Sequence, residues 1–310
     1  MVAVRWRNPD RDPPTRHCAQ VMENESVHEH DYVVPVNAYR EPLTVRSYEV
    51  TRTGYPQPGA ILRYLEFLAT HASASHGYTN TWYAEQGSAW LVREMALSLG
   101  WLPPMDTELM MATWVAEFRR VQAFREYAIW HPESGRIIAR ARARWAYVQR
   151  HSGQPLRVPE TMAALFSSAS SATRLPTLPP APTGMPLLRG EQVIVAREYE
   201  ADVHQHINNC VYGDWLHEGV AATLRAGGRH CGDARPRFLT LEYLRQVRPG
   251  DQARIETALY ADGSRRLRAI QTIRNAASGE IILRGQTRYL VASHWARDVN
   301  DRAEEAQGAG

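Results

Sequence analysis

An internal repeat is the feature that most restricts how this chain of 310 residues can fold. Tyr48-Glu49 reappears as Tyr199-Glu200, and the same offset of 151 residues carries Tyr64-Leu65 onto Trp215-Leu216. Self-similarity at a fixed offset is typical of a duplicated structural unit. Two copies of one unit are therefore expected within the chain.

A second match fixes the extent of the copies. Gly135-Arg-Ile-Ile-Ala-Arg140 reappears as Gly279-Glu-Ile-Ile-Leu-Arg284, at an offset of 144. The first copy then covers about 41–165 and the second about 189–295. Between them, 166–188 is rich in Ser and Pro and is expected to be an extended linker. Residues 1–40 are expected to form an N-terminal extension, and residues 296–310 a frayed tail.

Both copies show the same order of elements. In the second, 192–202 has strand character, and a helix is expected to begin at Asn208 and Asn209 and to end at Gly227-Gly228. Alternating strands follow, with a hairpin turn at Asp262-Gly263. The first copy repeats this, with a helix over 60–76 and strands over 88–149. The order β-α-β-β-β-β resembles the hotdog unit, and we expect an α+β tandem hotdog in which each antiparallel sheet wraps around a central helix.

Composition excludes several classes of protein. The net charge of +3 is small and dispersed, which does not favour nucleic acid as a partner. The three cysteines, Cys18, Cys210 and Cys231, are too few and too uneven for a disulfide framework or a cysteine zinc site. No run of 18 apolar residues and no signal peptide is found, so a cytoplasmic protein outside the membrane is expected.

One stretch of the second copy carries the chemistry. It reads Asp202-Val-His204-Gln-His206-Ile-Asn208-Asn209-Cys-Val-Tyr212-Gly-Asp-Trp215. It resembles the acyl-acyl carrier protein thioesterase family, in which Asp-x-Asn-x-His-x-Asn-Asn-x-x-Tyr-x-x-Trp joins the first strand of the C-terminal hotdog to its helix. The resemblance covers about 45–292. Further matching segments are Leu62-Arg-Tyr-Leu-Glu66, Trp90-Leu-Val-Arg93, Thr113-Trp114, Arg125-Glu-Tyr127 and Thr240-Leu-Glu-Tyr243.

The resemblance implies hydrolysis of the thioester of a fatty or polyketide-like acyl chain on acyl carrier protein, without a cofactor and with Asp202 and His206 at the catalytic positions. A separate physical argument agrees: if the backbone stays extended past Asp202, residues 202, 204 and 206 share one face. The first N–H groups of the following helix would then stabilise an oxyanion. Asn208 or Asn209 is a candidate for an oxyanion donor, although capping the helix is the simpler role for Asn209.

Two residues depart from the family's pattern. His204 stands where the family has Asn, and it can take up a proton. Gln246-Val247 stands where plant-type members carry Glu-Cys after the Thr-Leu-Glu-Tyr strand. Because Gln246 can orient a water but cannot accept its proton, either Asp202 with His206 suffices or the chemistry is altered or lost.

The first copy has no equivalent acid or base. At the offset of 151, the positions of Asp202, His204, His206 and Asn208 are occupied by Thr51, Thr53, Tyr55 and Gln57. We therefore expect a single site, with the first copy supplying structural pairing and the wall of a substrate tunnel. The candidates for that wall are Trp90, Trp114 and the helix face of Leu62, Leu65 and Leu68, and the second copy adds Tyr212 and Trp215 as tunnel candidates. All of these residues also suit plain core packing.

A basic strip is the candidate surface for a carrier protein. Arg140, Arg142 and Arg144 alternate with apolar residues, and Arg284 and Arg288 recur in the second copy. Such a strip suits either solvation or docking of an acidic carrier protein by electrostatic steering.

Several alternatives stay open. Asp202, His204 and His206 also suit a metal ion, Cys210 suits a thiol with a lowered pKa, and the cluster from His28 to Asp31 suits solvated surface. Besides hydrolysis of acyl-acyl carrier protein, the same residues allow hydrolysis of acyl-CoA, and a hotdog lyase or a non-catalytic acyl-binding protein is a further alternative. A lyase is disfavoured because tandem forms divide the acid and base between copies. Fusion of two units permits a monomer or a homodimer.

Overall fold

The duplicated element order is confirmed in the computed structural model, which describes residues 34–52, 54–166, 180–263 and 265–291. The first copy consists of β1 (Tyr39–Thr44), the 3-10 turn η3 (Ser47–Glu49), α2 (Pro58–Ala74), α3 (Asn80–Glu85), β2 (Ser88–Leu99), β3 (Glu108–Arg119), β4 (Gln122–Trp130), β5 (Ile137–Gln149) and α4 (Glu160–Phe166). The second consists of β6 (Leu188–Val195), η4 (Glu198–Glu200), α5 (Val211–Ala226), η5 (Cys231–Asp233), β7 (Ala234–Tyr243), β8 (Gln252–Ala261), β9 (Arg266–Asn275) and β10 (Ile281–Val291). Strand β6 ends well before Asp202, so the expected strand over 192–202 is wrong in its second half.

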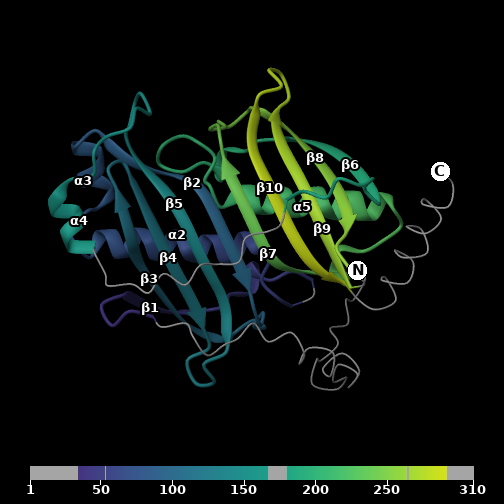
Figure 1. Cartoon of the computed structure of the whole chain (residues 1–310), viewed down its shortest axis with the longest axis horizontal. Helices are drawn as coiled ribbons and strands as arrows, with labels where there is room; N and C mark the ends of the chain where they lie inside the picture. The colour runs from purple at the N-terminus through teal and green to yellow at the C-terminus, as the bar shows by residue number, and fades with distance from the viewer. Residues whose placement is uncertain (1–33, 53, 167–179, 264, 292–310) are drawn as a thin grey trace, which may run out of the picture. The chain divides into compact units, whose positions relative to one another are not determined.

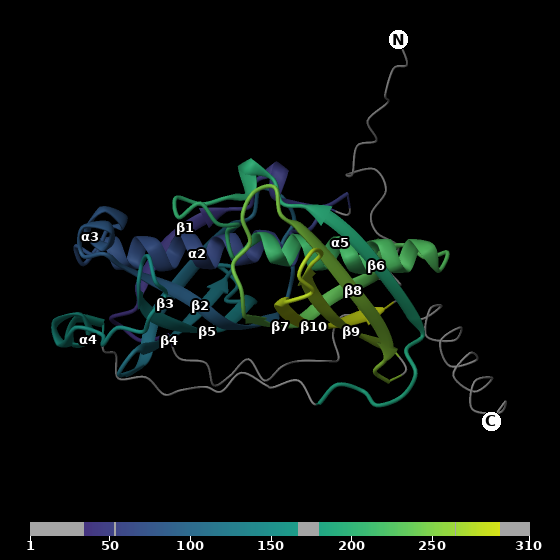
Figure 2. The same cartoon turned by 90° about the horizontal axis from the view of Figure 1, so that it is seen from above.

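The strands of the described residues form one antiparallel sheet of ten, in the order β1-β3-β4-β5-β2-β7-β10-β9-β8-β6. Each copy contributes five adjacent strands, and the copies join edge to edge at β2 and β7. The long helices α2 and α5 follow one another along the same face of the sheet (Figures 1 and 2). This is the hotdog arrangement repeated, as the sequence predicted.

The junction between the copies has the pattern of a two-fold interface. Ala96 of β2 lies opposite Thr240 of β7, and these positions are equivalent at the strand offset of 144. Arg63 of α2 forms an ion pair with Asp214 of α5, and these positions are equivalent at the helix offset of 151. Contact between equivalent positions is what a two-fold axis produces in a symmetric dimer. The two copies therefore associate within one chain as the protomers of a dimer would.

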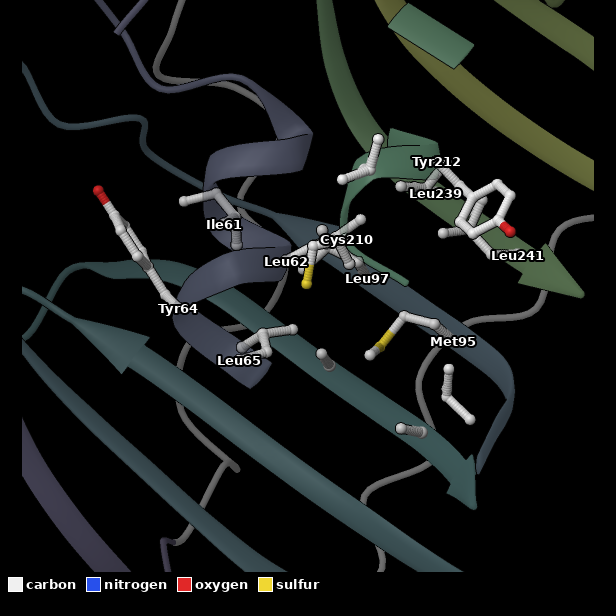
Figure 3. Packing of buried hydrophobic residues seen from close by; sticks show 14 of the residues in the cluster. Ile61, Leu62, Tyr64, Leu65, Met95, Leu97, Cys210, Tyr212, Leu239 and Leu241 are labelled. Atoms are coloured by element: carbon white, nitrogen blue, oxygen red, sulfur yellow. The ribbon is translucent and has the colours of Figure 1, made fainter. Parts of the chain in front are cut away.

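The core lies between the helices and the sheet and is continuous across this junction. Helix α2 begins at Pro58, where the missing N–H costs no hydrogen bond. It turns a fully buried stripe toward the sheet, which includes Ile61, Leu65 and Leu68. Figure 3 shows side chains of α2, of the start of α5 and of strands β2 and β7 meeting in one cluster. Leu62, Leu65 and Leu68 are thus core residues.

The residues that revealed the repeat form the same hydrogen bonds in both copies. Tyr64 Oη donates to Glu49 Oε2 at 2.6 Å, and Trp215 Nε1 donates to Glu200 Oε1 at 3.1 Å. Both glutamates also accept the backbone N–H of the residue three positions earlier. Each pair ties a 3-10 turn to the long helix of its copy, which explains why the sequence match is strongest there.

Some expectations fall outside the described residues: most of the N-terminal extension with Cys18 and the cluster from His28 to Asp31, most of the linker, and the tail. Within the described part of the chain, no helix is long and apolar enough to cross a membrane.

Candidate functional site

The backbone of the motif folds into a tight turn instead of an extended strand. Asp202 N–H donates to His206 O at 2.9 Å, and Gln205 N–H donates to Asp202 O at 3.0 Å. The Asp202 carboxylate also accepts the N–H of His204 at 2.8 Å, and this side-chain hydrogen bond stabilises the turn. The expected sharing of one face by residues 202, 204 and 206 therefore fails, because alternation needs an extended chain.

The first copy contains the same turn without the functional side chains. Thr51 N–H donates to Tyr55 O at 2.9 Å, and Gly54 N–H donates to Thr51 O at 2.8 Å. Bridges between Val50 and Pro56 and between Ala201 and Ile207 close the two turns equivalently. The turn is thus part of the duplicated unit, and only the second copy carries Asp202, His204 and His206 on it.

Gln205 occupies a strained position in this turn, which yields a first prediction. Its φ of +59° is in the left-handed region, where the first copy has Gly54 at +80°. Gln205→Gly is expected to raise the free energy of unfolding by about 0.5–1 kcal/mol, because relief of left-handed strain exceeds the entropy cost of glycine. Urea denaturation measures this change, and a less stable variant would show that Gln205 makes compensating contacts.

The surroundings of His206 favour its neutral form. Burial lowers its pKa, the nearby Arg248 guanidinium and the His204 ring lower it further, and the Asp202 carboxylate opposes them. Its Nδ1 is buried and has no hydrogen-bond partner among the residues that the structure describes. A neutral imidazole is a group that can accept a proton.

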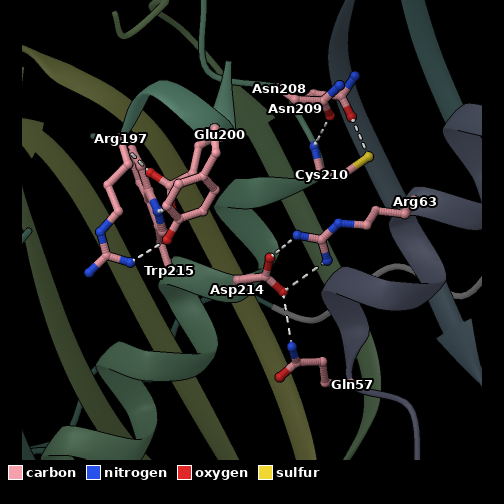
Figure 4. Close-up of polar contacts among 10 residues, drawn as sticks. Gln57, Arg63, Arg197, Glu200, Asn208, Asn209, Cys210, Asp214 and Trp215 are labelled. Atoms are coloured by element: carbon pink, nitrogen blue, oxygen red, sulfur yellow. Dashed lines mark hydrogen bonds and ion pairs between the residues drawn. The ribbon is translucent and has the colours of Figure 1, made fainter. Parts of the chain in front are cut away.

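The start of α5 differs from the expectation for Asn209. The helix begins at Val211, and Asn208 Oδ1 accepts the N–H of Cys210 at 3.0 Å. Asn209 does not cap the helix: its Nδ2 donates to Glu66 Oε2 of α2 at 3.1 Å (Figure 4 shows Asn208, Asn209 and Cys210). Burial raises the pKa of the Cys210 thiol, the opposite of what a nucleophile needs.

The first N–H groups of α5 are mostly engaged within the protein. Those of Cys210, Val211 and Gly213 donate to Asn208 Oδ1, Asn208 O and Cys210 O. The backbone N–H of Asn209 donates to no residue in the described ranges. Among the described residues, the donors at the start of α5 that stay available are therefore the Asn209 N–H and the side-chain amide of Asn208.

A cavity in the first copy reaches the motif. His204 lines it from the second copy, and Glu66 lines it from α2. Burial raises the pKa of Glu66, while the hydrogen bond from Asn209 lowers it. The remaining lining residues are Ala69, Thr70, Ser73, Tyr78, Asn80, Tyr83, Ala89, Trp90, Val115, Phe118, Ala123, Arg125, Trp145, Met162 and Phe166. Side chains of both copies thus meet where the motif and the cavity adjoin.

The same place in the second copy is filled with apolar side chains. Its buried cluster comprises Val220, Leu224, Ala234, Leu259, Leu267, Ala269, Tyr289 and Val291. At the two offsets, the first seven correspond to Ala69, Ser73, Trp90, Val115, Ala123, Arg125 and Trp145, all of which line the cavity. On the long helix, the small Ala69 and Ser73 leave room where Val220 and Leu224 occupy it. The first copy therefore contains the cavity and the second the polar motif, and the two adjoin at Glu66 and His204.

The other predicted tunnel residues lie elsewhere. Trp90 lines the cavity, but Trp114, Tyr212 and Trp215 do not. Tyr212 packs edge-on against Trp215, with ring centroids 5.2 Å apart. Gln246 is exposed, next to the buried Val247, whose carbonyl accepts Ile207 N–H at 2.8 Å. Its role in orienting a water stays a prediction.

The basic strip is largely neutralised by acidic neighbours. Arg142 pairs with Glu126, Arg144 with Glu94, Arg284 with Glu242 and Arg288 with Asp262, while Arg140 is buried. Glu94 and Glu242 face one another across the junction of the copies, so four of these charges form a row across β5, β2, β7 and β10. The strip carries less free positive charge than the sequence indicated.

A metal site finds no support in these side chains. Within the described ranges, no group of three His, Cys, Asp or Glu side chains is arranged to hold a metal ion. Asp202, His204 and His206 are adjacent in the turn, but they are not such a group.

Comparison with known proteins gives a consistent result. Residues 36–166 match the family model described as the acyl-ACP thioesterase N-terminal domain, and residues 190–297 match the acyl-ACP thioesterase C-terminal domain. A chloroplastic acyl-[acyl-carrier-protein] hydrolase of Cuphea viscosissima is 24% identical over 228 residues, which cover 68% of this chain and 52% of that protein. The oleoyl-acyl carrier protein thioesterase 2 of Arabidopsis thaliana is 22% identical, over 69% of this chain and 61% of its own length. The chain thus spans about half to three fifths of these relatives.

Solved structures support the fold. A putative oleoyl thioesterase from Lactobacillus plantarum has a TM-score of 0.71 at 19% identity, covering 83% of this chain and 98% of its own. The 12:0-ACP thioesterase from Umbellularia californica has a TM-score of 0.68 at 17% identity, covering 82% and 94%.

Proposed function

Because the chain belongs to the acyl-ACP thioesterase family, we propose that it hydrolyses the thioester that joins an acyl group to acyl carrier protein. The observation that carries this proposal is the composite site: a polar turn of the second copy adjoining a cavity of the first. Hydrolysis needs a proton acceptor for water and donors for the oxyanion, for which His206 and the N–H of Asn209 are the candidates. It also needs space for the acyl group, which the cavity beside His204 offers.

The proposed reaction uses His206 as the base. Its neutral imidazole takes a proton from a water, and the water oxygen forms a bond to the thioester carbonyl carbon. The N–H of Asn209 and the side-chain amide of Asn208 stabilise the resulting oxyanion. The carbon–sulfur bond then breaks, and the proton on His206 passes to the departing thiolate. Asp202 holds the turn through its hydrogen bond with His204 N–H and favours the transient imidazolium by its charge.

The pH dependence offers a second prediction. Because neutral His206 is the active form, activity is lost as the pH falls through the pKa of His206, which lies below its ordinary value. Arg248→Ala removes a positive charge that lowers this pKa, so the acidic limb of the kcat/KM profile is expected to move to higher pH. Arg245→Ala is the matched control, because Arg245 is equally exposed but pairs with Glu280. An unmoved limb in Arg248→Ala would remove His206 from the step that the profile reports.

The principal alternative is hydrolysis of acyl-CoA, which the same residues permit. Matched acyl groups on acyl carrier protein, on CoA and on pantetheine separate the two. We expect kcat/KM to be highest with the carrier protein and to decline toward that of the pantetheine thioester as salt rises, because steering by exposed charges is screened. Equal rates on CoA and carrier protein at all salt concentrations would favour the acyl-CoA thioesterase. Binding without turnover would indicate a non-catalytic acyl-binding protein.

A further inference from the structure

The cavity wall combines aromatic rings with unused hydrogen-bond donors. Six aromatic residues line it: Tyr78, Tyr83, Trp90, Phe118, Trp145 and Phe166. A plain alkyl chain needs only apolar walls, as in the filled cluster of the second copy. The fold therefore does not require the polar groups among the rings, and their positions indicate what kind of ligand the cavity binds.

Arg125 is the clearest of these groups. Its position on β4 is equivalent to that of the buried Ala269 on β9. One of its five N–H donors reaches Thr113 Oγ1 at 3.3 Å, and its guanidinium lies 5.8 Å from the centre of the Phe166 ring. It forms no ion pair with any described residue, although the charge of Glu66 across the cavity favours its cation. Burial lowers the pKa of Arg125, which reflects the cost of a cation that lacks an adjacent anion.

Ser73 and Tyr83 leave a second donor free. Ser73 Oγ and Tyr83 Oη are 2.9 Å apart, so one of their two hydroxyl protons is shared between them. Trp90 Nε1 donates to Tyr83 Oη at 3.2 Å and occupies a lone pair without supplying an acceptor. Whichever hydroxyl donates within the pair, the proton of the other hydroxyl has no acceptor among the described residues.

We propose that the cavity accepts an acyl group that bears at least one further oxygen beyond its thioester carbonyl, bound by Arg125 and by the Ser73–Tyr83 pair. This inference rests on the proposed thioester hydrolysis. A keto or carboxylate oxygen offers the acceptor that these donors lack, whereas a methylene chain would leave them unpaired. A buried donor left without a partner costs about 1–3 kcal/mol, which corresponds to about 5–150-fold in affinity.

The test compares octanoyl with 3-oxo-, 5-oxo- and 7-oxooctanoyl groups on acyl carrier protein, so that length is constant and only the oxygen moves. At least one oxo substrate is expected to exceed octanoyl by about 10-fold or more in kcat/KM. Arg125→Met is expected to lower the ratio of that oxo substrate to octanoyl by about 10–100-fold, and Tyr83→Phe by a smaller factor. Val115→Ala, an apolar change in the same wall, is the matched control and is expected to leave the ratio unaltered.

A binding measurement separates this inference from the proposed function. Non-hydrolysable pantetheine amides of the same four acyl groups are titrated into the wild type and Arg125→Met by calorimetry. Tighter binding of an oxo amide that Arg125→Met abolishes would support the polar cavity even if no thioester is hydrolysed. Turnover with octanoyl at least equal to every oxo substrate, an unaltered ratio in Arg125→Met, or no preference among the amides would overturn it.

Discussion

Replacing His206 with alanine is expected to lower kcat/KM for an acyl thioester by about 10³-fold, because positioned acid–base groups contribute about 10²–10⁴-fold to such reactions. Asp202→Asn is expected to cost about 10²-fold or more. The asparagine side chain can still accept the N–H of His204, so the turn is retained while the carboxylate charge beside His206 is lost. Single-turnover hydrolysis, monitored by release of the free carrier protein, measures both changes without interference from product release.

Val203→Ala is the control for this pair of variants. Val203 belongs to the same turn but is 70% exposed, so its truncation tests whether any change in the turn disturbs the reaction. We expect its rate within about twofold of the wild type, in keeping with substitutions at exposed positions. Unaltered rates in both His206→Ala and Asp202→Asn would mean that the motif is only scaffold in this chain.

The fold was predictable because its signals are periodic and duplicated. Helix spacing before Gly227-Gly228 and strand alternation before Asp262-Gly263 predicted the element order of the second copy. The first copy showed the same order, and this agreement supported the assignment of the elements in both. The turn at Asp202 was missed because Gln205 carries no turn signal of its own. The signal lay in the first copy, where Gly54 stands at the equivalent position and has a φ of +80°.

The candidate site was only half visible in the sequence. The motif was found through its polar residue types. The cavity results from the combined sizes of many side chains, so no single residue of the sequence indicates it. Comparison of the copies would have indicated it, since Ser73 and Arg125 stand where the second copy has Leu224 and Ala269. Trp114, Tyr212 and Trp215 were assigned to the tunnel on residue type alone, which does not distinguish a cavity wall from a packed core.

The close approach of the two long helices underlies a last expectation, which concerns the junction on which the composite site depends. A Cβ atom at Gly213 of α5 would lie 2.7 Å from Leu62 Cδ1 and 3.2 Å from the Cα atom of Gly59, both on α2. Gly213→Leu is therefore expected to lower the free energy of unfolding by about 3 kcal/mol, because overpacking outweighs the gain in helix propensity. Urea denaturation measures the loss, and Arg225→Leu, at an exposed position of the same helix, is the control.

A double-mutant cycle distinguishes the clash from a general disturbance of α5. Leu62→Ala alone is expected to cost about 2–5 kcal/mol, because Leu62 is fully buried. It also vacates the space that the new leucine at position 213 would occupy, so the combined variant is expected to be more stable than the sum of the single losses by about 1 kcal/mol or more. Strict additivity would contradict a direct contact. Asn209, which follows the turn, donates to Glu66 of α2, and this hydrogen bond depends on contact between the two helices. A loosened junction is therefore also expected to slow hydrolysis without any change in the catalytic side chains.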